Sequence, residues 1–74
     1  MTTTTHLADE FKGSPRYKSI LAVFQAVDGL KDSDSVGGVM MLMNATAGHC
    51  NGTERDRLPD LVRQSLKERG LRDQ

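Results

Sequence analysis

Residues 36–47, VGGVMMLMNATA, can form either a helix or a buried strand, and the fold class depends on which they form. Met and Leu are good helix formers, β-branched residues are sparse here, and the chain offers no second strand for pairing. Gly37 and Gly38 each weaken a helix by up to about 1 kcal/mol, and their simplest role is to allow close helix packing. We expect a helix over residues 35–48, with a strand over residues 39–43 as the alternative.

Apolar residues at helical spacing predict one further helix on each side of this segment. The first covers about residues 15–28, with Ser14 as its N-cap and Pro15 at its first position. Its apolar stripe consists of Tyr17, Ile20, Leu21, Phe24 and Val27. The last helix covers about residues 58–69, and its stripe consists of Leu58, Leu61, Val62, Ser65 and Leu66.

Glycines follow the first and last of these stripes. Gly29 and Gly70 are expected at the C′ positions, with Leu71 folding back onto Leu66 in a Schellman motif. Pro59 complicates the start of the last helix, because proline inside a helix removes a hydrogen bond and clashes with the preceding turn. The sequence leaves open whether residues 53–58 are continuous with that helix.

The expected architecture is therefore all-α, a small three-helix bundle with a flexible N-terminal arm. The arm covers residues 1–13, in which Leu7 and Phe11 could dock as one short turn. Residues 14–74 form a single helical domain, because 74 residues leave no room for a second one.

Composition excludes several classes of function. Ten basic and ten acidic residues give a net charge of zero, so we do not expect a nucleic-acid partner. A single cysteine allows no internal disulfide, and the His and Cys spacing carries no metal signature, so neither a metal nor another cofactor is expected. The longest stretch without a charged residue or a histidine, residues 35–48, is too short to span a membrane, and no signal peptide is recognisable. These features are typical of a cytoplasmic protein.

His49 and Cys50 form the only adjacent pair with catalytic chemistry in reach. A thiol nucleophile needs an imidazole within hydrogen-bond distance, and neighbouring residues on a helix point about 100° apart. No group of residues provides the acid, base and nucleophile of an active site, so we expect a protein that is not an enzyme.

The apolar residues of the segment 36–47 point around most of a helix, more than two neighbouring helices could cover. Methionine is also frequent at adaptable binding surfaces. We therefore expect an interface that consists of Val36, Val39, Met40, Met41, Leu42 and Met43. Polar contacts to a partner could come from Arg55, Arg57, Arg63 and Lys67, although mixed charges at this spacing are typical of a solvated helix face.

The function that we expect is a small protein–protein interaction module that self-associates, as a homodimer or higher oligomer, through its Met-rich helix. It would occupy a surface on a larger protein, as small regulators, adaptors and inhibitors do, phage-encoded inhibitors of host machinery among them. One alternative is a dimeric helix-turn-helix-like DNA-binding regulator that uses residues 53–69. Another is a small-ligand or nucleotide-binding module at an oligomer interface.

Overall fold

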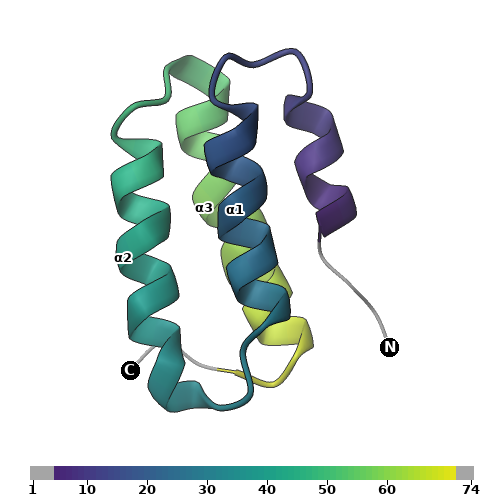
Figure 1. Cartoon of the computed structure of the whole chain (residues 1–74), viewed down its shortest axis with the longest axis vertical. Coiled ribbons are helices and arrows are strands. Elements are labelled where there is room, and N and C mark those ends of the chain that lie inside the picture. The colour runs from purple at the N-terminus through teal and green to yellow at the C-terminus, as the bar shows by residue number, and fades with distance from the viewer. Residues whose placement is uncertain (1–4, 72–74) are drawn as a thin grey trace.

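The structure is a computed structural model that describes residues 5–71. A 3-10 helix, η1 (Thr5–Phe11), precedes α1 (Tyr17–Asp28); a 3-10 turn, η2 (Ser33–Ser35), leads into α2 (Val36–Ala47), and α3 (Gly52–Glu68) follows. No strand occurs among residues 5–71, so the expected all-α three-helix bundle is confirmed and the strand alternative over residues 39–43 is wrong. The three long helices run alternately down, up and down (Figure 1).

The core lies between these three helices and is almost entirely aliphatic. Phe24 is fully enclosed, and each helix directs its apolar stripe toward it. The fully or nearly fully buried apolar residues of the three long helices are Ile20, Val23, Phe24, Val27, Val36, Val39, Met40, Met43, Leu58, Leu61, Val62 and Leu66.

The first helix begins two residues later than the sequence predicts, because Ser14 does not act as its N-cap. The Ser14 hydroxyl instead accepts a hydrogen bond from the Arg16 amide at 3.0 Å and donates one to the Glu54 carboxylate. Pro15 therefore lies in the turn before α1, and Arg16 becomes the N-cap residue, with no side-chain cap. The turn is thereby joined to the start of α3.

The third helix is continuous through Pro59, which settles the status of residues 53–58: they belong to α3. Its first residue, Gly52, has a φ of +57°, a left-handed conformation that glycine adopts without a steric penalty. Its end is the Schellman motif expected from the sequence. Gly70 has a φ of +73°, and the amide of Leu71 donates to the carbonyl of Leu66 at 2.9 Å.

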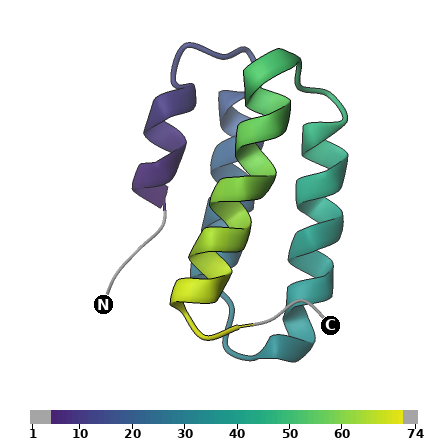
Figure 2. The ribbon, with the colours of Figure 1, turned by 180° about the vertical axis from the view of Figure 1, so that it is seen from behind.

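The N-terminal segment contains a 3-10 helix that packs on the bundle. Residues 5–11 form η1, which packs along α1 on the side away from α2 (Figures 1 and 2). Ala8 is fully buried and Phe11 is 4% exposed, so the expected docking of Phe11 is confirmed. Glu10 reinforces this position by accepting a hydrogen bond from Arg57 Nε of α3 at 3.1 Å. Residues 1–4 of the predicted arm lie outside the described residues.

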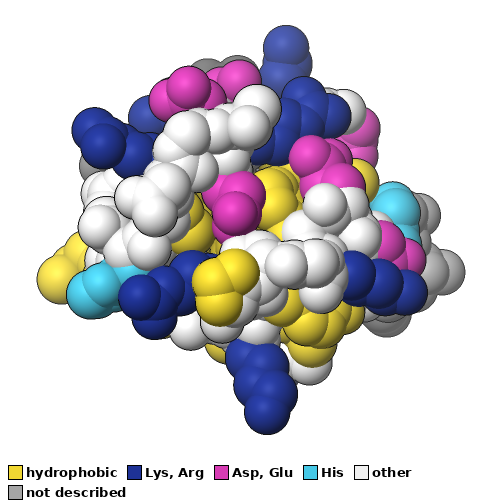
Figure 3. Space-filling view, turned by 90° about the horizontal axis from the view of Figure 1, so that it is seen from above, with side chains coloured by type: hydrophobic (Ala, Val, Ile, Leu, Met, Phe, Trp, Pro, Cys, Tyr) yellow, Lys and Arg dark blue, Asp and Glu magenta, His cyan; other side chains and the backbone are white. Residues whose placement is uncertain are grey.

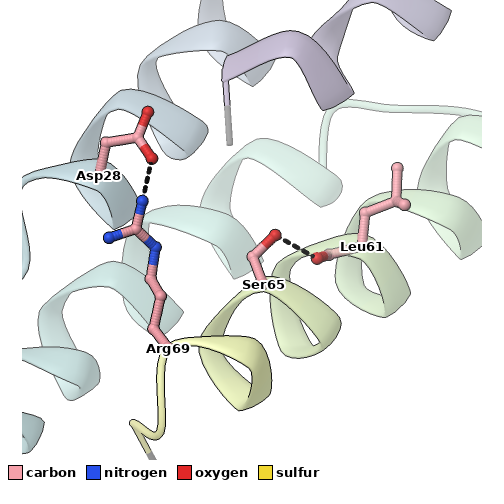
Figure 4. A network of polar contacts seen from close by, with 4 residues as sticks. All are labelled: Asp28, Leu61, Ser65 and Arg69. Atoms are coloured by element: carbon pink, nitrogen blue, oxygen red, sulfur yellow. Dashed lines mark hydrogen bonds and ion pairs between the residues drawn. The ribbon is translucent and has the colours of Figure 1, made fainter. Parts of the chain in front are cut away.

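Two polar contacts stabilise the opposite end of the bundle, where α1 and α3 both finish (Figure 4). The half-buried Asp28 carboxylate pairs with the guanidinium of Arg69, and so joins the last turn of α1 to the end of α3.

The buried Ser65 hydroxyl donates to the Leu61 carbonyl at 2.9 Å, so its hydrogen-bonding requirement is met within α3. Ser65 can therefore lie within an apolar stripe without a net polar penalty.

Candidate functional site

The exposed side of α2 carries no charged residue. We call this surface the α2 outer face; it consists of Gly37, Gly38, Met41, Leu42, Asn44 and Ala45. Met41 is 74% exposed and Leu42 is 40% exposed, and they are the two large apolar side chains that the described chain leaves most open to solvent. The face is therefore apolar at its centre and uncharged to its edges.

The structure reduces the number of predicted interface residues that a partner could contact. Four of its six residues point into the bundle: Val36, Val39, Met40 and Met43 are at most 8% exposed. They recur at intervals of three and four residues, so they form one stripe that α1 and α3 cover together. The prediction was wrong in treating these four as available to a partner. Met41 and Leu42 are the predicted interface residues that the folded chain presents.

Gly37 and Gly38 are not needed for packing within the described chain. A Cβ atom built on either residue would meet no other atom within 4 Å. Close packing against α1 or α3, the role considered from the sequence, therefore does not explain them. Both lie on the α2 outer face, one helical turn before Met41 and Leu42.

The four basic residues predicted as polar docking contacts all lie on the exposed side of α3. Arg57 is already engaged with Glu10, at 3.1 Å. Within residues 5–71, Arg55, Arg63 and Lys67 make no ion pair. They alternate with acidic side chains along the helix, so no continuous basic surface results.

A small pocket opens at the end of the bundle where α1 begins and α2 ends. Its volume is about 130 Å³, and it is lined by Arg16, Ser19, Ala45, Thr46 and His49. Figure 3 views this end directly and shows a histidine lying beside basic side chains. Sequence reasoning missed Arg16, Ser19 and Thr46. Only the topology could have indicated these residues. In an up-and-down bundle, the start of one helix and the end of the next lie at the same end of the molecule.

Cys50 and His49 do not form a catalytic pair. The Cys50 thiol is buried and donates to the Thr46 carbonyl at 3.4 Å, whereas His49 is exposed. Burial raises the pKa of the Cys50 thiol, and the Glu54 carboxylate raises it further, while Arg16 acts in the opposite direction. The thiol is therefore held in its protonated, weakly nucleophilic form at neutral pH. His6, the other histidine, is exposed on η1.

No group of three or more His, Cys, Asp and Glu side chains within residues 5–71 is arranged to hold a metal ion. None of the helices in that range has both the length and the hydropathy to cross a bilayer.

The α2 outer face and the neighbouring pocket thus remain the features that call for a functional explanation. Comparison of the chain with protein-family models, with curated proteins and with solved structures finds no match.

Proposed function

We propose that this protein is a non-enzymatic interaction module that self-associates through the α2 outer face and, in that form, occupies a surface on a larger protein. The observation that carries the proposal is the exposure of Met41, at 74%, in the middle of a helix without charges. Isolated exposed apolar residues are common on protein surfaces. Here, however, Met41 and Leu42 are adjacent and their surroundings are also uncharged.

The charge distribution supports this proposal. Charged residues make up 27% of the chain, so about three would be expected in a twelve-residue surface helix, whereas α2 contains none. An uncharged face can meet a copy of itself without like-charge repulsion, as a two-fold symmetric interface requires. The exposed side of α3 carries arginines, a lysine and carboxylates, and that of α1 carries Lys18. These charges would have to be desolvated in a comparable contact.

The two glycines provide a second argument. Each lowers the stability of α2 by up to about 1 kcal/mol relative to alanine, and neither accommodates a neighbour within the described chain. Residues without a side chain allow the backbones of two helices to approach closely. Together with Ala45 they leave Met41 and Leu42 standing above a low surface, a shape that fits an approaching helix.

The strength of the association can be estimated from the exposed fractions. Complete burial of a Met or Leu side chain contributes about 1.5–3 kcal/mol. With 74% of Met41 and 40% of Leu42 still to be buried, each protomer gains about 2–3 kcal/mol. A symmetric pair gains about twice that amount, against an association cost of at least about 4 kcal/mol. We therefore expect a weak dimer that depends on protein concentration, and a stronger complex only with a partner that covers more surface.

Sedimentation velocity over about 10 μM to 1 mM protein, a range suited to weak association, tests the proposal. The wild-type sedimentation coefficient should rise with concentration, and Met41→Asp should remove that rise. Gln25→Asp, on the exposed side of α1, introduces the same charge change outside the α2 outer face and should leave the rise intact. Lys67→Ala should also leave it intact. A wild-type protein that remains monomeric throughout, or equal effects of the two Asp variants, would contradict self-association through α2.

No structural observation favours the helix-turn-helix alternative. In Figure 1, α2 and α3 run antiparallel, whereas the two helices of that motif cross at about 90–120°. Glu54 and Asp56 alternate with Arg55 and Arg57 in the first turns of α3, where a recognition helix would need net positive charge. The pocket is the feature relevant to the small-ligand alternative.

A further inference from the structure

The pocket between α1 and α2 has the size of a single functional group. Its volume is about 130 Å³. Sites for whole cofactors and drug-sized ligands are usually about 300–1,000 Å³, so a complete nucleotide would not be enclosed here. A phosphoryl or carboxylate group would fit, with the rest of its molecule left outside.

Thr46 indicates that this pocket is adapted to a polar ligand. The residue is only 6% exposed, and its hydroxyl makes no hydrogen bond within residues 5–71. A helical Ser or Thr hydroxyl commonly bonds to the carbonyl four residues earlier, as Ser65 does. The Thr46 hydroxyl does not do so, and it is not sealed from solvent either. Because Thr46 lines the pocket, this opening is where its hydroxyl can find a partner.

Further donors converge on the same place. Arg16 and Ser19 line the pocket from the start of α1, and His49 lines it from the end of α2. Neither Arg16 nor His49 takes part in an ion pair in the described part of the chain. The backbone amide of Ser19, in the first turn of α1, also lacks an acceptor there. Free amides at a helix N-terminus favour a bound anion.

The electrostatic balance at the pocket is positive. No carboxylate lines it, and Arg16 contributes a permanent positive charge. Glu54 lies close enough to influence the Cys50 thiol, but its carboxylate is hydrogen-bonded to Ser14 and does not form part of the lining. The carbonyl end of α2 opposes the charge, as a partial negative charge. Arg16 therefore lines a pocket to which no Asp or Glu side chain contributes.

We propose that this pocket binds one phosphoryl group, either as inorganic phosphate or as the end of a phosphomonoester. The guanidinium of Arg16 would take two of its oxygens, because the planar fork of arginine matches such pairs. The hydroxyls of Thr46 and Ser19, the His49 ring and the free Ser19 amide supply donors for the others. This donor set exceeds what the two oxygens of a carboxylate require, and so favours the tetrahedral group. The proposal is independent of self-association through the α2 outer face.

Titration of the ¹⁵N-labelled full chain with inorganic phosphate at constant ionic strength tests the site. We expect saturable amide shifts centred on Ser19, Thr46 and His49. Arg16→Gln should weaken binding by about tenfold or more, because it removes a charge-assisted pair of hydrogen bonds. Thr46→Val keeps the shape but removes the hydroxyl, and should weaken binding by about threefold to tenfold. Lys18→Gln removes an equal charge from the same helix outside the pocket lining, and should change binding by less than about twofold.

Parallel titrations identify the ligand more closely. Phosphoserine with both termini blocked represents the ester, and acetate represents the carboxylate. Tighter binding of blocked phosphoserine than of phosphate would assign the site to phosphomonoesters, and the reverse order would assign it to the free ion; either result supports the proposal if Arg16→Gln weakens it. The absence of saturable shifts with both phosphates would overturn the proposal, as would acetate binding as tightly as phosphate. Equal effects of Arg16→Gln and Lys18→Gln would also overturn it.

Discussion

Replacement of Pro59 by alanine should make this protein more stable. Pro59 is the eighth residue of α3, where its ring removes the hydrogen bond to the Arg55 carbonyl and crowds the preceding turn. Proline in a helix interior is about 3 kcal/mol less favourable than alanine. Alanine also increases the entropy of the unfolded chain, which offsets about 0.4–1 kcal/mol of this gain. With some further loss of packing by the half-buried ring, we expect a net gain of about 2 kcal/mol.

For a domain of this size, about 1 kcal/mol shifts Tm by about 4–8 °C, so Pro59→Ala should raise Tm by about 8–16 °C. Thermal unfolding followed by circular dichroism, together with guanidinium titration, measures both quantities. Pro15→Ala is the matched control, because Pro15 lies in the turn before α1. Its replacement should lower stability by about 0.4–1 kcal/mol through the unfolded state alone. If Pro59→Ala left Tm unchanged or lowered it like the control, the α3 backbone would already be free of the strain inferred here.

Three further substitutions test contacts described above. Phe11→Ala should lower the free energy of unfolding by about 3 kcal/mol in guanidinium titration, because Phe11 is 4% exposed in the core; a loss below about 1 kcal/mol would mean that η1 contributes little to the fold. Asp28→Asn should lower it by about 1 kcal/mol by removing the Asp28–Arg69 ion pair, and an unchanged midpoint would show that this pair is energetically neutral. Stability should also fall as the pH rises above 9.0, the ordinary thiol value, because the pKa of Cys50 is raised in the folded protein and the unfolded chain loses this proton first. Cys50→Ser should abolish that part of the pH dependence and retain the fold, and a pH profile identical to that of the wild type would exclude the thiol as its source.

The local signals in the sequence predicted the helices well. Gly70 shows why: a glycine followed by a leucine after an apolar stripe specifies the Schellman motif through backbone geometry and one nearby contact. Gly29 resembles Gly70 in sequence but has a φ of −84°, and it ends α1 in a right-handed conformation. The expectation of a C′ glycine was therefore wrong there. The α1 to α2 connection, which the local sequence does not specify, determines how the chain leaves that helix.

The sequence could not show which residues of α2 are exposed, because helical periodicity does not separate a buried side from an exposed side where every residue is uncharged. In α1 the polar residues identify the exposed side, whereas in α2 a buried Met40 and an exposed Met41 are chemically the same. Only the positions of α1 and α3 distinguish them. Pro59 posed a related problem. Proline disfavours a helix interior, whereas burial of Leu58 and Leu61 on both sides of it favours a continuous helix, and α3 is continuous.

The pocket could not be predicted from the local sequence, for a different reason. Arg16 and His49 are separated by most of two helices, and no motif connects them. Their proximity follows from the lengths of α1 and α2, twelve residues each, which bring the start of one level with the end of the other. The unpaired hydroxyl of Thr46 is likewise a property of the folded chain, because the same residue on an exposed helix face would be hydrated.

The contacts of the N-terminal segment have a consequence for folding while the chain is being synthesised. Two of its polar anchors, Glu10 with Arg57 and Ser14 with Glu54, join residues 47 and 40 positions apart. A growing chain that had left the ribosome only as far as α2 could form α1 and bring η1 against it, but it would have no α3 to fasten either anchor. The first segment to be synthesised is thus among the last to form all its contacts. Until α3 has folded, η1 and Phe11 pack against α1 without these two polar contacts.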